Sequence, residues 1–233
     1  VNPPIYPVQN LRLAFVPVDR HVPVGFWRSV AHSWTTFFIE SFIDELATAA
    51  NAEPLDFRQR ALTDRPRHLQ VLNTLKEALD RRGQPAPGHG LGYAIAESHA
   101  TVVAHAVEVS SKDGVFARVE RVICVVDCGP VVHPDNVIAQ MEGSIIDGLS
   151  AALHGQVLIR GGSVATGNFN DYPLLRLEHS PAIEVHLIAS QQPRPGGVGE
   201  PGLPGVAPAL CNAIHAATGR RIRTLPVLGT SIA

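Results

Sequence analysis

Cysteine, charge and long apolar runs are all scarce in this chain of 233 residues. The three cysteines, Cys124, Cys128 and Cys211, argue against a disulfide framework and do not supply the four ligands of a zinc site or an iron–sulfur cluster. We expect them to be free thiols, buried or half-buried. Charged residues make up 17% of the chain and the net charge is −2, which argues against binding to nucleic acid or a membrane surface. No apolar run reaches the ~18 residues that span a bilayer.

Familiar catalytic motifs are missing as well. The eleven histidines are scattered without an H-E-x-x-H motif, and no G-x-S-x-G nucleophile elbow is present. The glycine-rich "GHGLGYA" (88–94) lacks the lysine of a phosphate-binding loop and the spacing of a dinucleotide site, so it is predicted to be a turn. His99 and His105 are expected on one face of an extended segment, a pattern more typical of packing than of a metal site. We therefore assign no metal ligand.

What is present is an apolar globular composition, 45% hydrophobic, with enough residues for one large domain or two small ones. The pattern of apolar residues predicts helices over 34–51, after a Ser33 cap, and from Pro66 to Gly83. In the first helix the apolar face is expected to contain Phe38, Phe42, Leu46 and Ala49, with Glu40, Asp44 and Glu45 largely on other faces. Strands are predicted over 11–19, within 92–110 and 115–129, over 182–190, and as two strands joined by a turn over 157–176.

Turn signals divide the chain further. The segment 83–90 is the best linker candidate, and Lys112-Asp113-Gly114 between apolar runs predicts a hairpin. The continuous apolar run over 122–126 predicts a strand that is covered on both faces. A final helix is expected to start near Pro204 and to stop at Gly219.

The helix that follows Pro134 carries two stripes of different character. One is apolar and faces the core; the other is small and polar, so that a polar ligand can approach the helix backbone closely. A solvated face or tight helix packing gives the same pattern, and both readings stay open. The apolar stripe contains Val137, Met141, Ile145 and Leu149, and the polar stripe contains Gln140, Gly143, Ser144 and Asp147.

The stretch "GGVGEPGLPGVAP" (196–208) places one carboxylate, Glu200, among glycines and prolines. Glycines before it remove side chains, and Pro201 and Pro204 stiffen the chain after it. The carboxylate is therefore expected on a rigid loop near a helix N-terminus. A structural acid stabilised by the helix dipole is the alternative.

Three long stretches, in order along nearly the whole chain, carry a family resemblance. "GVGEPGLPGVAPALCNAIHAATGRRIRTLPV" (197–227) closely resembles the C-terminal signature of the molybdenum hydroxylases, the xanthine dehydrogenase and aldehyde oxidase family. "VICVVDCGPVVHPDNVIAQMEGSIIDGLSAAL" (122–153) and "GFWRSVAHSWTTFFIESFIDELA" (25–47) resemble two further segments of that family. The sequence of the last stretch most resembles the large, β-type subunit of isoquinoline 1-oxidoreductase-like enzymes.

The resemblance implies roles for particular residues. Glu200 matches the active-site glutamate, the base next to molybdenum. Arg28, with Trp27 as its aromatic neighbour, matches an arginine loop near the active centre, although "SVAHS" stands here where the family usually has a glycine-rich loop. Gln140 matches a glutamine that contacts the pterin. The implied cofactor-binding residues are Gln140, Arg28, Trp27, Val198, Gly199 and Gly143.

The resemblance also implies a fold and a division of the chain. The expected fold is α+β, with mixed β-sheets packed against helices, as the C-terminal part of a molybdenum-cofactor-binding domain. Residues 1–86 would form a strand and two helices with the arginine loop, and residues 87–233 a β-rich and helical cofactor-binding region with the glutamate loop.

The function implied is hydroxylation of an aldehyde or an N-heteroaromatic carbon with water as the oxygen source. The cofactor would be a molybdopterin-type molybdenum cofactor in its cytosine dinucleotide form. The chain starts at "VNPPIYPVQN", and we expect it to act together with the upstream part of the molybdenum subunit. An iron–sulfur subunit is expected as a separate chain. A flavin or cytochrome subunit is an additional possible partner. The bacterial cytoplasm and periplasm both stay open. A non-catalytic assembly fragment and an unrelated soluble binding domain are the alternative hypotheses.

Overall fold

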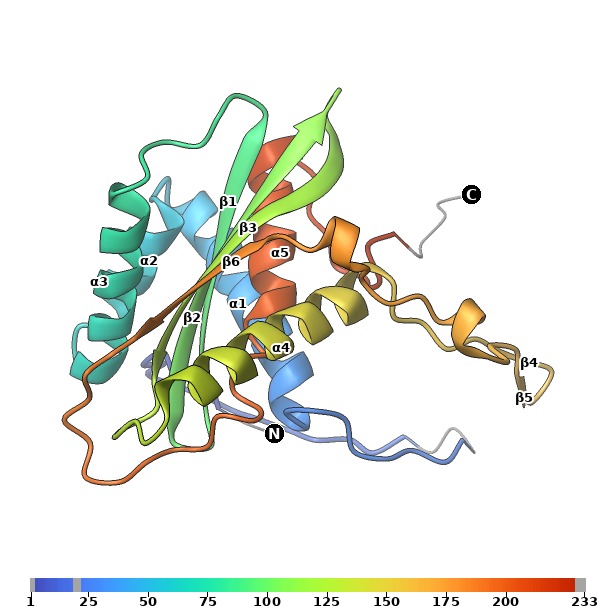
Figure 1. The fold of residues 1–233 in the computed structure, drawn as a ribbon, viewed down its shortest axis with the longest axis horizontal. Coiled ribbons are helices and arrows are strands. Elements are labelled where there is room, and N and C mark those ends of the chain that lie inside the picture. Colours follow the sequence, from blue (N-terminus) through green and yellow to red (C-terminus); the bar gives the residue numbers. More distant parts are fainter. Residues whose placement is uncertain (1–2, 19–21, 229–233) are drawn as a thin grey trace.

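One mixed β-sheet forms the centre of the protein (Figure 1). The computed structural model describes residues 3–18 and 22–228. In the sheet, the strand order is β1-β2-β3-β6; the first three strands are antiparallel, and β6 pairs parallel to β3. The expected α+β fold with a mixed sheet and packed helices is confirmed. The strands are β1 (His89–Ser98), β2 (Thr101–Lys112), β3 (Val115–Asp127) and β6 (Ala182–Leu187).

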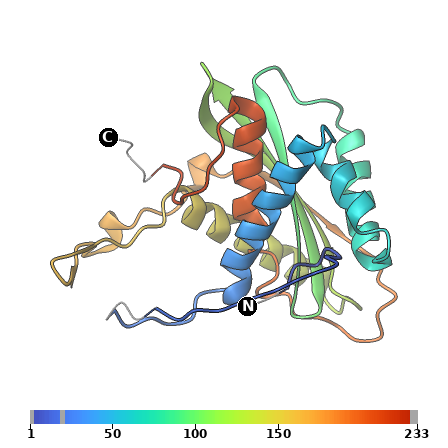
Figure 2. The same ribbon diagram turned by 180° about the vertical axis from the view of Figure 1, so that it is seen from behind.

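Helices cover both faces of this sheet (Figures 1 and 2). Along β3, Cys124 faces the core shared with α4 and α5, whereas its neighbours Ile123 and Val125 face the core shared with α2 and α3. The prediction that this strand is covered on both faces is therefore confirmed. Helix α1 packs on α5 and on β1. The helices are α1 (Ala31–Ala49), α2 (Pro54–Ala61), α3 (Pro66–Asp80), α4 (Pro134–Leu153) and α5 (Val206–Thr218).

Two tight turns connect the three antiparallel strands. Asp113 and Gly114 both have positive φ, 54° and 75°, which matches a two-residue hairpin turn and confirms the prediction there. His99 and Ala100 form the β1–β2 turn, also with positive φ. The expectation that His99 and His105 share a strand face is wrong, because His99 lies in this turn while His105 is buried in the middle of β2.

The glycine-rich segment before this turn is not a turn itself. Gly90 and Gly92 lie within β1, where α5 crosses the strand. A Cβ atom on Gly90 would lie 2.4 Å from the backbone nitrogen of Ala217, and one on Gly92 would lie 2.1 Å from that of Ala213. The prediction of a turn over 88–94 is therefore wrong. Glycine occurs here because the helix backbone lies directly on the strand.

Helix α1 is turned the opposite way from the expectation. Phe38 and Phe42 are 64% and 59% exposed, whereas Glu40 and Asp44 are 1% and 4% exposed. The acids are inside because cations pair with them there: the guanidinium of Arg58, fully buried on α2, pairs with both, and Arg221 pairs with Asp44 at 2.6 Å. The helix also begins at Ala31, so Ser33 is not its N-cap; the Ser33 hydroxyl donates to the carbonyl of Val30 inside the first turn.

Helix α2 was not expected, although its signals are present in the sequence. The Glu53 side chain caps the helix by accepting from the backbone N–H of Asp56, and Pro54 occupies the first helical position. The helices at 66, 134 and 206 and the strand at 182 are confirmed, with Gly219 ending α5 in a left-handed conformation. The apolar stripe of α4 is buried as expected.

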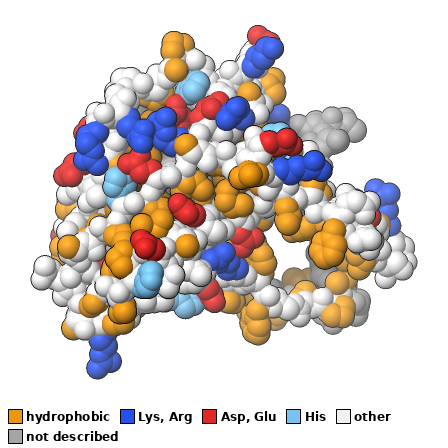
Figure 3. Space-filling view, viewed as in Figure 1, with side chains coloured by type: hydrophobic (Ala, Val, Ile, Leu, Met, Phe, Trp, Pro, Cys, Tyr) orange, Lys and Arg blue, Asp and Glu red, His pale blue; other side chains and the backbone are white. Residues whose placement is uncertain are grey.

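Two arms project from the same side of the body (Figures 1 and 2). Residues 7–18 and 22–26 form the N-terminal arm, and 11–18 are irregular and exposed, so the strand expected over 11–19 is wrong there; residue 19 lies outside the described residues. The second arm, 155–180, contains only the two-residue strands β4 (Ile159–Arg160) and β5 (Ser163–Val164) and two single 3₁₀ turns. Hydrophobic side chains line both arms around the gap between them (Figure 3).

The three cysteines are free and buried, as expected. Within the part of the chain that the structure describes, no helix has the length and hydropathy to cross a membrane. The division at residues 86 and 87 stays a prediction.

Candidate functional site

Glu200 lies on the loop between β6 and α5, called here the Glu200 loop (residues 193–205). Backbone hydrogen bonds hold this loop on the sheet: the N–H of Gly196 donates to the carbonyl of Cys128 at 2.7 Å, and the N–H of Gly197 donates to the carbonyl of His99 at 2.8 Å. The Thr101 hydroxyl donates to the Gly197 carbonyl at 2.6 Å. The loop is therefore fixed by the strand end and by the β1–β2 turn, as the proline-rich sequence suggested.

The glycines of this loop serve two different purposes. A Cβ atom on Gly196 would lie 2.4 Å from the Thr101 hydroxyl oxygen, and one on Gly205 would lie 2.6 Å from Nδ1 of His105. These two glycines allow the loop to pack on its own protein. A Cβ atom on Gly199 would meet nothing within 4 Å. The open space lies beside Gly199, the residue directly before the carboxylate.

The turn before α1 holds Glu200 directly. The backbone N–H of Ser29 donates to Oε2 of Glu200 at 3.2 Å, and the Ser29 hydroxyl donates to the Glu200 carbonyl at 2.6 Å. Ser29 and Val30 have φ values of 69° and 47°. Such values favour glycine and are strained for a β-branched residue, at a cost of about 1–3 kcal/mol. Serine and valine thus adopt, in "SVAHS", the backbone conformation that a glycine-rich loop takes without strain.

Arg28 connects this loop to helix α4. Its Nε donates to the carbonyl of Gly199 at 2.8 Å, and its NH2 group donates to Oε1 of Gln140 at 3.3 Å. Its NH1 group lies 3.5 Å from Oδ2 of Asp147. The structure therefore brings together four of the residues singled out in the sequence: Arg28, Gln140, Gly199 and Glu200. The guanidinium is directed at protein oxygens, so it acts as a clamp between two segments.

The remaining candidates lie around this cluster with fewer contacts. The indole of Trp27 is exposed, and its carbonyl accepts from the N–H of Val30. Val198 is half-buried and packs against the hydrophobic core. Gly143 is exposed on α4, one turn after Gln140, with nothing within 4 Å of where its Cβ would lie.

The exposed surface of α4 and the Glu200 loop suits a polar ligand. Gln140 presents an amide, and Gly143 and Gly199 leave open space before the backbone. An amide and backbone groups supply both donors and acceptors, which match the hydrogen-bonding edges of a pterin. The residues present therefore fit such a group. Within the described ranges, no three histidine, cysteine or acidic side chains gather as a metal site would require.

Sequence reasoning missed the histidines beside Glu200. Nε2 of His99 lies 3.4 Å from Oε2 of Glu200, and the rings of His99 and His32 have centroids 6.0 Å apart. Burial and the neighbouring His99 lower the pKa of His32, while Glu200 opposes that shift. No local motif marks this arrangement, since the three residues come from α1, the β1–β2 turn and the Glu200 loop.

A further histidine, His105, lies under the Glu200 loop. It is fully buried, and this burial lowers its pKa from 6.5 to about 4, against a smaller opposite effect of the Gly202 backbone. Between these two pKa values the unfolded chain binds more protons than the folded chain. The stabilisation that a neutral His105 confers is therefore complete above about pH 6.5 and is lost progressively as the pH falls toward about 4.

This shift predicts an acid-sensitive stability. Between about pH 7.5 and about pH 5, His105 should lower the free energy of unfolding by about 2 kcal/mol, and His105→Leu should remove that part of the pH dependence. Urea unfolding of both chains at the two pH values measures it. Equal pH dependence in the two chains would show that His105 does not carry the effect.

Fold and sequence together define an α+β cofactor-binding domain. The chain belongs to the molybdopterin cofactor-binding domain family of the molybdenum hydroxylase large subunits: the family model matches residues 43–181, more than half of the chain. The matched range includes Gln140 and Gly143 but neither Arg28 nor Glu200.

Individual relatives agree with this family. The chain is 38% identical to isoquinoline 1-oxidoreductase subunit beta from Brevundimonas diminuta, over 95% of this chain and 29% of that protein. It is 31% identical to one of the chains of nicotinate dehydrogenase from Pseudomonas putida, over 96% of this chain and 20% of that protein. The chain thus spans less than a third of the length of these curated relatives.

A solved structure shows the same fold. The structure of quinoline 2-oxidoreductase from Pseudomonas putida 86 matches with a TM-score of 0.78 at 14% identity, over 88% of this chain and 52% of that one.

Proposed function

We propose that this chain is the catalytic-glutamate part of a molybdenum hydroxylase that oxidises an N-heteroaromatic compound or an aldehyde with water as the oxygen source. The observation that carries the proposal is the cluster in which Arg28 and Ser29 hold Gly199 and Glu200 against α4. The relatives named for isoquinoline and nicotinate support a nitrogen heterocycle as the substrate class. The fold alone is shared with more distant structures.

In this proposal the molybdopterin cofactor, in its cytosine dinucleotide form, supplies the redox chemistry when bound. The chain itself binds, orients and handles protons. Gln140, with Gly143 one turn later, holds the pterin on the exposed face of α4. Glu200 accepts a proton from the water-derived oxygen, which requires its carboxylate to be ionised and fixed within hydrogen-bond reach. The N–H of Ser29 donates to the carboxylate, and the Ser29 hydroxyl donates to the backbone carbonyl of Glu200.

The test of cofactor binding is Gln140→Leu in the assembled enzyme. Leucine keeps the size of the side chain but removes the amide, so molybdenum occupancy should fall severalfold, since a hydrogen bond contributes about 1 kcal/mol or more. Metal analysis and circular dichroism report occupancy and fold. The matched control is Gln156→Leu, at an exposed position after α4, which should leave occupancy unchanged. Wild-type occupancy in Gln140→Leu would refute the pterin role.

The chain also exposes apolar surface that a complete molybdenum subunit would cover. Trp34, Phe38, Phe42 and Leu46 form an exposed stripe along α1, one turn apart. The family relatives carry more than twice as many residues outside the matched segment as within it. We propose that the remaining part of the molybdenum subunit packs on this stripe, and that an iron–sulfur subunit accepts the electrons.

Charge on this stripe should prevent assembly. Phe38→Glu with Phe42→Glu should weaken association with the rest of the subunit at least about thirtyfold, because central aromatic residues contribute about 2 kcal/mol or more to an interface. Co-purification measures this, with Val115→Glu at the exposed tip of the β2–β3 hairpin as the control. Unchanged co-purification would refute the contact, and disruption of a dimer of this chain in light scattering would assign the stripe to a second copy instead.

A further inference from the structure

Three groups from distant parts of the chain form a line that leads away from Glu200. The carboxylate Oε2 lies 3.4 Å from Nε2 of His99, and the His99 ring lies 6.0 Å from the ring of His32, centroid to centroid. A base that accepts a proton in each turnover must release it before the next. A nearby imidazole can take that proton, because its ordinary pKa is near neutrality.

His99 is held against the glutamate by the backbone. Its carbonyl accepts from the N–H of Gly197 at 2.8 Å, and a Cβ atom on Gly197 would lie 3.1 Å from the Cβ of His99. Its φ of 51° is a left-handed value, which non-glycine residues seldom adopt. The β1–β2 turn therefore presents this side chain to the Glu200 loop at a cost in backbone strain, an arrangement typical of functional sites.

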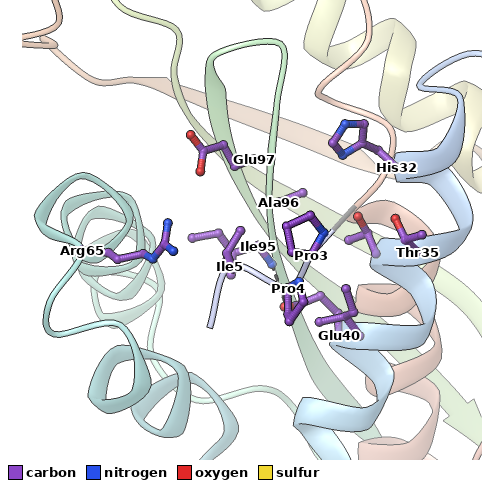
Figure 4. A pocket seen from close by; sticks show the side chains of 12 residues that line it. Pro3, Pro4, Ile5, His32, Thr35, Glu40, Arg65, Ile95, Ala96 and Glu97 are labelled. Carbon is purple, nitrogen blue, oxygen red and sulfur yellow. Dashed lines mark hydrogen bonds between the residues drawn. The ribbon is translucent and has the colours of Figure 1, made fainter. Parts of the chain in front are cut away.

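His32 continues the line to a cavity. It points from the first turn of α1 toward a cavity of about 230 Å³ between α1, β1 and the N-terminal segment (Figure 4). The charged groups that line this cavity are Glu40, Arg65 and Glu97. Of these, Glu40 is engaged by Tyr6 and Arg58, and Glu97 lies 3.0 Å from Nε2 of His68. Burial lowers the pKa of His32 and so disfavours its imidazolium form, and a proton that reaches this ring is readily released.

We propose that His99 removes the proton from Glu200 and passes it by way of His32 to solvent in this cavity. The inference rests on the proposed function. Glu200–OH gives its proton to Nε2 of neutral His99 and returns to the carboxylate, while His99 becomes an imidazolium. His99 then loses its other N–H proton toward His32, over a separation that one bridging water can span. Glu200 is again a carboxylate and one proton has moved outward. His99 is left with its proton on Nε2, and rotation of its ring or exchange of that proton with water restores the starting tautomer before the next turnover.

The decisive variant is His99→Gly in the assembled enzyme. Glycine adopts the positive φ freely and keeps the backbone bond to Gly197, so the loop should remain in place. We expect kcat to fall at least about tenfold at unchanged cofactor content, since a positioned acid–base group contributes typically 10²–10⁴-fold. Added imidazole should restore kcat in this variant and leave the wild type unchanged. His99→Asn, which fills the space, should lose kcat without rescue.

A second measurement needs no cofactor and no turnover. In an NMR titration of the 233-residue chain, the pKa of His32 should rise in His99→Gly and fall in Glu200→Gln, because His99 lowers that pKa and Glu200 raises it. A His32 pKa that both variants leave unchanged, or unchanged kcat in His99→Gly, would overturn the pathway. Loss of turnover in Glu200→Gln but not in His99→Gly would refute the proton pathway and leave the proposed function intact. Full turnover in Glu200→Gln would refute the proposed function itself.

Discussion

Replacing Glu200 by glutamine should lower the turnover of the assembled enzyme by about 10²–10⁴-fold, the range that general-base catalysis contributes. Glutamine keeps the size of the side chain, and its carbonyl oxygen can still accept from the N–H of Ser29, which now donates to Oε2 at 3.2 Å. The amide cannot accept a proton at working pH. The loop, the clamp by Arg28 and the cofactor content should therefore be unchanged while the chemical step slows.

Two comparisons make this result interpretable. Molybdenum content in Glu200→Gln must equal that of the wild type, so that turnover is compared per loaded site. The matched control is Glu142→Gln, which removes a carboxylate from the exposed side of α4 and should leave kcat unchanged. Retention of more than about a tenth of wild-type turnover in the loaded variant lies outside the general-base range and would make Glu200 a structural acid at the start of α5.

In helix α4, sequence periodicity alone is sufficient to predict which side chains are buried in the core. Its apolar stripe was predicted from spacing alone. The prediction holds because the core against which the stripe packs is itself apolar. In its polar stripe, Ser144 is buried with its hydroxyl donating to the carbonyl of Gln140, whereas Gln140 itself is exposed. Part of that stripe is therefore packing, and a role of its exposed part in binding a ligand stays a prediction.

Helix α1 shows where the same reasoning fails. Hydrophobicity placed Phe38 and Phe42 inside, yet the buried side chains are Glu40 and Asp44. A hydrophobic pattern cannot show that a cation from another helix will be buried against these acids. Nor does it distinguish an apolar face that meets the core from one that meets another part of a larger protein.

Local sequence marked Glu200 and Gln140, whereas Arg28 and the roles of all three residues came from the resemblance. Arg28 and Gly199 are 171 residues apart in sequence, and no local pattern indicates that they meet. His99 was placed on a strand because Ser98-His99-Ala100-Thr101 lacks the Asn-Gly or Asp-Gly signal of a tight hairpin. The turn forms there nevertheless, since the backbone of the Glu200 loop pairs with it.

The buried acids of α1 lead to the second large effect. The carboxylate of Glu40 accepts from the Tyr6 hydroxyl at 2.6 Å, from Nε of Arg58 at 2.9 Å and from the N–H of Ile95 at 3.2 Å. Burial lowers the pKa of Arg58, but Glu40, Tyr6 and Asp44 raise it by more, so the guanidinium is charged at every working pH. This network connects the N-terminal segment, α1, α2 and β1 in the interior.

Arg58→Met should therefore lower the free energy of unfolding by about 3–5 kcal/mol, because methionine fills the space but leaves Glu40 as a buried charge without its cation. The matched control is Lys76→Met on α3. Lys76 pairs with Asp56 at 2.5 Å, but both side chains are nearly half exposed, so its loss should change stability by no more than about 1 kcal/mol. Urea unfolding of the three chains at neutral pH measures the difference. Similar small losses in both variants would show that the buried pair contributes no more than a surface one. A large loss in Arg58→Met alone would establish that Arg58 holds the acids of α1 inside. That orientation leaves Phe38 and Phe42 exposed for the packing proposed above.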